Sequence, residues 1–216
     1  MAIAIAIITA LIWLGIVQRP ASTVLDESAT ERVRRSFPMM IGLLLASTLT
    51  VLLTASGTPS ATAALVIGVF AATTSTQTVV DAATRRLPLR ISHLATVTIV
   101  TLTVIDRPTA TLSVLAGTVS MWAIAWSMAR LTRGSLGRGD VHYSPLLGAA
   151  IGWSSPWPDL PTGLLMAWMI TAVSAAVVTL AALAIGRIDR RATVPYGPFL
   201  SIGAITVVAI ALGGTS

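Results

Sequence analysis

The sequence contains no cysteine and no lysine, and only 10% of its 216 residues are charged. Without cysteine the chain has no disulfides, no cysteine nucleophile and no thiolate metal site. A soluble domain of this length needs far more charge to cover its surface. The scarcity of charge therefore argues against an ordinary soluble protein and makes a membrane protein the class to expect.

Apolar residues make up 55% of the chain and give it a mean hydropathy of +0.86. Apolar stretches of near-spanning length recur along the chain. We expect an all-α, polytopic membrane helix bundle with about eight transmembrane helices, forming one integral membrane domain over residues 1–216. The expected segments are residues 2–17, 38–55, 61–80, 91–105, 109–128, 141–154, 162–185 and 199–212. Segment 141–154 is short and is expected to be interrupted by Pro145, Gly148 and Gly152.

Arginine supplies every basic residue, and its distribution predicts the topology. Thirteen of the 14 arginines fall in the loops that end on one side of the expected bundle, and Arg107 alone falls on the other. The positive-inside rule places the rich side in the cytoplasm and both termini outside, so that residues 18–37 form a short cytoplasmic loop. No basic cluster carries interleaved aromatic residues, so nucleic-acid binding is not expected despite a pI of about 11.4.

Two of the eight acidic residues, Asp81 and Asp140, stand apart from the others. Asp106 and Asp159 lie beside prolines, where they are expected to form turns. Asp81 and Asp140 instead lie where an expected membrane segment meets the arginine-rich side, and the two segments between them return the chain to that side. A carboxylate at membrane depth is costly, and it indicates a functional site.

The residues before Asp81 support this interpretation. Thr74, Gln77, Thr78 and Asp81 have helical spacing and form a polar stripe that should face a bundle interior or a wet cavity. The alternative for Asp81 is an ion pair with Arg85 at the helix end.

Asp140 closes the short sequence Gly137-Arg138-Gly139-Asp140. Glycines let the backbone approach closely and adopt positive φ beside an acid, so this loop could accept an extended peptide. Two neighbouring aspartates do not both ionise easily, and the pKa of one rises. The charged member can then activate water while the neutral member donates a proton, which is aspartic peptide hydrolysis and requires no metal or cofactor.

Three stretches resemble the motifs of one family, the type IV prepilin peptidases. Residues 81–88, Asp-Ala-Ala-Thr-Arg-Arg-Leu-Pro, resemble its D-x5-[I/L]-P motif, and residues 137–141 resemble its G-x-G-D-[V/I] motif. Residues 194–200, Val-Pro-Tyr-Gly-Pro-Phe-Leu, followed by Gly203 and Ala204, resemble its late motif I-P-[FY]-G-P-F-L-x-x-G-A. The resemblance covers residues 58–213, which we interpret as the peptidase-like region.

The resemblance implies a membrane aspartic endopeptidase of the bacterial cytoplasmic membrane, with Asp81 and Asp140 as the catalytic pair. Its substrates would be type IV prepilins or prepilin-like precursors (pseudopilin or Flp-type), each with a single span in the lipid bilayer and a leader cleaved at the cytoplasmic face. Substrate-binding or supporting roles fall on Arg85, Arg86, Pro88, Gly137, Gly139, Pro195, Gly197 and Pro198.

The chain departs from the family pattern in two places. Bifunctional members carry a domain, often with paired cysteines, after the first span, whereas residues 18–37 are expected to form a short loop without cysteine, which puts N-methyltransferase activity in doubt. His142 stands where the family often has lysine, and it either tunes Asp140 or sits at the interface. Two alternatives to the peptidase remain: a small proton-coupled transporter or channel that uses the two aspartates, and a catalytically inactive family member.

Overall fold

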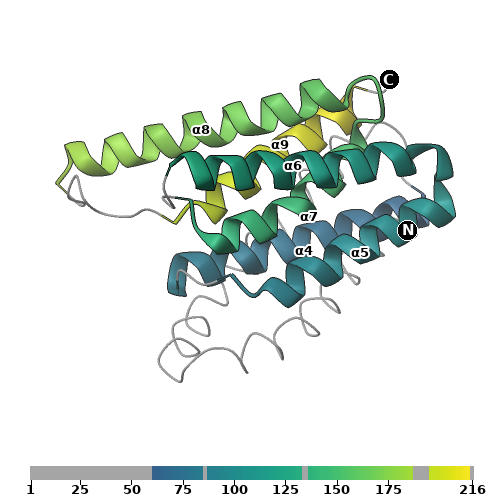
Figure 1. Cartoon of the computed structure of the whole chain (residues 1–216), viewed down its shortest axis with the longest axis horizontal. Coiled ribbons are helices and arrows are strands. Elements are labelled where there is room, and N and C mark those ends of the chain that lie inside the picture. Colours follow the sequence, from purple (N-terminus) through teal and green to yellow (C-terminus); the bar gives the residue numbers. More distant parts are fainter. Residues whose placement is uncertain (1–59, 85–86, 133–135, 187–194, 215–216) are drawn as a thin grey trace.

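The computed structural model of the protein describes residues 60–84, 87–132, 136–186 and 195–214. These residues form six α-helices and one short 3-10 helix, and no strand occurs among them. In chain order they are α4 (Ala61–Thr84), α5 (Leu89–Asp106), η1 (Pro108–Ala110), α6 (Thr111–Leu131), α7 (Arg138–Ser154), α8 (Leu160–Ala184) and α9 (Gly197–Gly213), shown in Figure 1. The all-α prediction is confirmed for this part of the chain.

Four of the helical stretches are long and apolar enough to cross a membrane: Ala61–Ala82, Leu89–Asp106, Pro108–Leu131 and Leu160–Ala184. Helix α9 is a shorter apolar helix. The protein is therefore a multi-spanning helical membrane protein. The count of eight spans stays a prediction, because expected segments 2–17 and 38–55 and the loop 18–37 lie outside the described residues.

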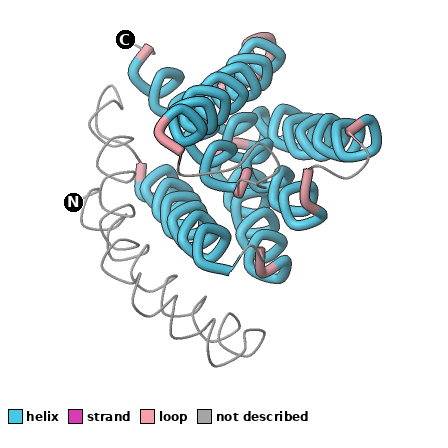
Figure 2. Tube along the Cα trace, turned by 90° about the vertical axis from the view of Figure 1, so that its left-hand side faces the viewer, coloured by secondary structure: helices cyan, strands magenta, loops and turns pink. Residues whose placement is uncertain are grey.

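Helix α7 lies at the centre of the bundle, in contact with α5, α6 and α9. Thirteen of its 17 residues are buried, so other helices rather than lipid surround it. Helix α8, in contrast, exposes large apolar side chains along its outer face, including Leu165, Met169 and Val173. Figure 2 views the helices nearly end-on and shows them gathered in one bundle. Its central position lets α7 keep polar residues such as Asp140 and Ser144 away from lipid.

Glycines allow α6 and α7 to approach closely. A Cβ atom at Gly148 would meet the backbone of Gly117, and one at Gly152 would meet the backbone of Ser113. Small residues at such contacts let helix backbones pack closely, which is how membrane helices gain contact energy.

The prediction that segment 141–154 is interrupted was wrong, because α7 is one continuous helix. Pro145 has no N–H to donate to the carbonyl of Val141. The Ser144 hydroxyl donates to that carbonyl instead, at 2.9 Å. A neighbouring hydroxyl thus satisfies the group that proline leaves open, as occurs in other membrane helices with proline. The glycines do not break the helix, because Gly148 and Gly152 lie at its contact with α6.

The helix boundaries differ from the predicted ones mainly at the aspartates. Helix α4 continues past residue 80 to Thr84, and α7 begins at Arg138 rather than at residue 141. Asp81, expected in a loop or at a helix end, therefore lies in the last turn of α4. Asp140, expected at the end of a loop, lies in the first turn of α7.

Candidate active site

Asp81 and Asp140 lie at the same end of the bundle, where α4 ends and where α7 and α9 begin. Each aspartate is only 6% exposed. Leu87, which follows Asp81 in the first motif, lies against Gly139, the residue before Asp140. The charge of Asp81 raises the pKa of Asp140, as expected for carboxyl groups at one site. The structure therefore brings together two residues that lie 59 positions apart in the sequence.

Asp81 is held by the start of α9. Its Oδ2 accepts a hydrogen bond from the Gly197 backbone N–H at 3.1 Å. A Cβ atom at position 197 would lie 2.8 Å from the same oxygen, so this position has no room for a side chain unless the carboxyl group moves. Pro195 and Pro198, on either side, are partly buried. The late motif thus contacts Asp81 directly through Gly197.

Asp140 occupies the third position of α7, where its Oδ2 accepts the Gly137 backbone N–H at 3.2 Å. This is one half of a capping box, and glycine has no side chain to supply the other half. The second oxygen, Oδ1, is buried and has no hydrogen-bond partner in the described part of the chain. A buried carboxyl oxygen without a partner is costly, and it is free to hold or donate a proton.

The glycines beside Asp140 act through their small size and not through positive φ, which corrects the expectation. Gly137 has φ −62° and ψ 146°, which is ordinary extended backbone. A Cβ at Gly137 would lie 3.0 Å from the Asp140 carboxylate. One at Gly139 would lie 3.0 Å from Cβ of Leu87, a residue of the first motif. The second motif therefore packs against the first through a position that lacks a side chain.

Burial sets the protonation of Asp140, which precedes the apolar part of α7. Removal from water is the largest cause that raises the pKa of Asp140 from its ordinary value of 3.8 to about 7, and the charge of Asp81 raises it further. The hydrogen bond from Gly137 opposes both effects. Near neutral pH Asp140 is therefore in balance between its acid and its carboxylate.

The polar stripe on α4 faces the bundle interior, as predicted. The Gln77 amide donates to the Ser92 hydroxyl at 2.7 Å and to the Pro88 carbonyl at 3.2 Å. It thereby holds the start of α5 and the end of the first motif against α4. Thr74 is fully buried and donates to the Phe70 carbonyl of its own helix. Pro88 therefore has a structural contact to the residues that precede Asp81.

Ser201 joins three helices beneath the aspartates. Its hydroxyl lies 2.7 Å from the Tyr143 hydroxyl, accepts from Thr78 at 3.1 Å and donates to the Gly197 carbonyl at 3.0 Å. The network therefore fixes the residue whose N–H contacts Asp81. Sequence reasoning missed Ser201 and Tyr143, although helical spacing gave a signal. Tyr143 follows Asp140 by three positions, and Ser201 follows Gly197 by four.

The remaining candidates are placed as follows. His142 is exposed and its ring lies edge-on to that of His93, with centroids 5.7 Å apart, and the choice between its two expected roles stays open. Arg85, Arg86 and residues 187–194 lie outside the described residues, so the ion pair between Asp81 and Arg85 is untested. Within the described ranges, no three His, Asp or Glu side chains are grouped to hold a metal ion.

The fold and the site together define a polytopic helical membrane protein with two buried aspartates at one end. The chain is 36% identical over 96 residues to a prepilin leader peptidase/N-methyltransferase of Burkholderia pseudomallei (strain 1026b), a match that covers 44% of this chain and 28% of that protein. It is 35% identical over 109 residues to the protein of that name from Dickeya chrysanthemi, which covers 50% of this chain and 36% of the relative. A third such protein, from Pectobacterium carotovorum subsp. carotovorum, is 33% identical over 97 residues, covering 44% of this chain and 32% of its own length.

These relatives confirm the resemblance to the type IV prepilin peptidase family. The chain covers between 28% and 36% of the length of these curated relatives. No family model matches the chain. No solved structure matches it either.

Proposed function

We propose that this protein is a membrane aspartic endopeptidase that removes the leader peptide from prepilins or prepilin-like precursors. The observation that carries this proposal is the buried pair of Asp81 and Asp140, one of which balances between its two protonation states near neutral pH. The relatives named prepilin leader peptidase supply the substrate class. The proposal concerns the peptidase part of those names and not the N-methyltransferase part.

The chemistry assigns a different role to each aspartate. Asp140, whose Oδ1 has no partner among the described residues and whose pKa is raised, holds the proton. Asp81 then serves as the carboxylate that takes a proton from water. The resulting hydroxide attacks the scissile carbonyl. Asp140 holds the proton that passes to the carbonyl oxygen and then to the leaving amine. The products are a carboxylate and an amine, and no cofactor takes part.

The neighbouring residues support the pair. Gly137 and Gly139 lack side chains that would crowd the Asp140 carboxylate and Leu87, and through them the two motifs pack closely beside Asp140. Arg85, Arg86, Pro88, Pro195, Gly197 and Pro198 complete the set of substrate-binding or supporting residues. The arginine distribution supports the part of this proposal that puts this end of the bundle on the cytoplasmic side, with both termini outside. A single-span precursor would then present its leader to the aspartates from the cytoplasmic side.

Co-expression with a prepilin tests the proposal. Wild-type protein should convert the precursor to a shorter mature form on a denaturing gel, and Asp81→Asn and Asp140→Asn should each lower the cleavage rate by about 10³-fold. Asp106→Asn is the matched control, because that acid is the last residue of α5, at the other end of the bundle. It should cleave at the wild-type rate.

Two outcomes contradict the proposal. If the leader persists with wild-type protein that has inserted in the membrane, the peptidase function fails. If one Asn variant cleaves normally, the role of that aspartate fails. Proton flux into proteoliposomes that depends on both aspartates, without cleavage, would instead favour the transporter or channel.

A further inference from the structure

A pocket of about 460 Å³ opens between α6 and α7, beside the aspartates but on the outer side of α7. Its lining includes Trp122, Trp126 and Arg130 from α6, and Arg138 and His142 from α7. The two residues from α7 flank Asp140 in the sequence, yet they are exposed whereas Asp140 is buried. The pocket is therefore separate from the face that the aspartates occupy.

The pocket is positively charged. Arg130 and Arg138 contribute two permanent charges, and none of its described lining residues is acidic. The Arg130 guanidinium lies 4.9 Å from the centre of the Trp126 ring, and Trp126 stacks on Trp122 with centroids 6.3 Å apart. A guanidinium over an aromatic face keeps its donors available at the edge, where an anion can bind in a forked geometry.

An apolar stripe leads from this pocket toward the middle of the bundle. Leu115, Val119, Trp122 and Trp126 follow one another on α6 at intervals of four, three and four residues, so they share one face. All four are exposed, with Trp122 at 41% and Trp126 at 44%. In a bilayer this face contacts acyl chains, and tryptophans at its end mark the headgroup level.

We propose that the pocket formed by Trp122, Trp126, Arg130, Arg138 and His142 binds the phosphate of an anionic phospholipid whose acyl chains lie along the α6 stripe. Basic pockets between membrane helices suit such headgroups, because each Arg near the surface attracts an anionic lipid. Such a lipid has one negative charge next to apolar chains. The site has two arginines in the pocket next to the apolar stripe on α6, so each part of the lipid meets a matching part of the site. A lipid bound there would contact the exposed side of α7, and Asp140 would lie on the buried side of the same helix.

Lipid retention measures this binding directly. The purified protein is placed in mixed micelles with equal amounts of dioleoyl phosphatidylglycerol and dioleoyl phosphatidylcholine, and native mass spectrometry counts the lipids that stay bound. Wild-type protein should retain phosphatidylglycerol preferentially. The double variant Arg130→Gln/Arg138→Gln should lower its retention by about tenfold and leave phosphatidylcholine unchanged. Arg130→Gln alone should lower it by about threefold, which covers the case in which the double variant does not fold.

Arg107→Gln is the matched control. Arg107 also lies over a tryptophan, 5.5 Å from the centre of the Trp153 ring, but at the other end of the bundle. This variant should retain phosphatidylglycerol as the wild type does. Inorganic phosphate at the same concentration as the lipid should not displace it, because the acyl chains contribute to binding.

Three results overturn the lipid site: equal retention of the two lipids by wild-type protein, equal loss in the Arg107→Gln variant, and displacement by inorganic phosphate. The last result would assign the pocket to a free anion. Because no cleavage is measured, failure here leaves the proposed peptidase activity standing, and loss of that activity leaves the lipid site standing.

Discussion

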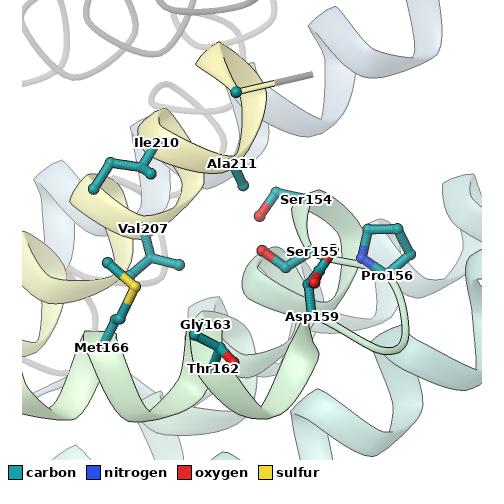
Figure 3. Close-up of a pocket in the computed structure, with 11 residues that line it drawn as sticks. Ser154, Ser155, Pro156, Asp159, Thr162, Gly163, Met166, Val207, Ile210 and Ala211 are labelled. Carbon is teal, nitrogen blue, oxygen red and sulfur yellow. The ribbon is translucent and has the colours of Figure 1, made fainter. Parts of the chain in front are cut away.

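The two ends of the bundle treat their acids differently. At one end Asp140 is 6% exposed, and its Oδ1 has no hydrogen-bond partner among the described residues. At the other end Asp106 is exposed, and its carboxylate lies 3.7 Å from Nε of Arg107. Asp159 is also exposed there, and it lines a pocket of about 370 Å³ together with Ser154 and Ser155 (Figure 3).

The contrast is one of cost in stability: the exposed acids cost the fold little, whereas the buried acid destabilises it. An exposed carboxylate at a helix end, beside an arginine, changes the free energy of unfolding little. A buried carboxyl with an open oxygen costs stability, and proteins retain such groups chiefly at functional sites. Arginine over tryptophan occurs at both ends, so it distinguishes neither. Burial of the acid is therefore the feature that distinguishes the end where we propose the active site.

The largest expected difference concerns the glycines at the two ends of α9. Gly197→Ala places a Cβ 2.8 Å from Oδ2 of Asp81, so the carboxyl group has to move. Misplacement of a reacting group on this scale should lower the cleavage rate by about ten- to hundredfold. Gly214→Ala meets its nearest atom, the Ile210 carbonyl oxygen, at an ordinary 3.4 Å. Rates are measured on membranes that contain equal amounts of inserted protein, and equal rates for the two variants would remove the contact with Gly197 from the mechanism.

The second difference is in the pH dependence. The pKa of Asp140 is raised to about 7, so the proton that the mechanism needs is present below pH 7 and is lost above it. Cleavage should therefore fall by about tenfold per pH unit on the alkaline side, with an apparent pKa that belongs to the pair. Asp106→Asn should show the same fall in cleavage rate on the alkaline side. A rate that stays constant from pH 6 to pH 9, with substrate binding unchanged, would contradict the role of Asp140 as proton donor.

The smallest difference concerns two buried serines that bridge separate segments. Ser201 joins α4, α7 and α9 near the aspartates, and Ser113 accepts the Trp157 N–H at 2.9 Å at the other end. Each Ser→Ala variant leaves buried groups without a partner and should cost about 1–3 kcal/mol of stability. Thermal unfolding in detergent should show similar losses for both variants.

Activity should separate the same two variants. Ser201→Ala should lower the cleavage rate several-fold, because its hydroxyl donates to the carbonyl of Gly197, which in turn contacts Asp81. Ser113→Ala should cleave at the wild-type rate at a temperature where both are folded. If the two lose activity in parallel, Ser201 supports the fold and does not position the aspartate.

Much of the fold could be predicted, because its signals are local. Apolar runs bounded by glycine, proline and charge located six helices to within a few residues, from α4 to α9. The two spans between Asp81 and Asp140 were enough to return both to one end. The continuity of α7 was not predictable in the same way, since it depends on the Ser144 hydroxyl and on close contact with α6.

The sequence by itself determined the class of protein, the side of the membrane toward which the arginine-rich loops are expected to point, and the two acids to examine. Hydropathy, charge and the number of spans between two residues follow from short segments of the sequence, so they can be predicted without any long-range contact. Only the tertiary structure decided that Asp140 is buried with one open oxygen, that Gly197 contacts Asp81, and that Ser201 links three helices. These features depend on contacts between residues far apart in the chain, and their energies arise only when the helices pack.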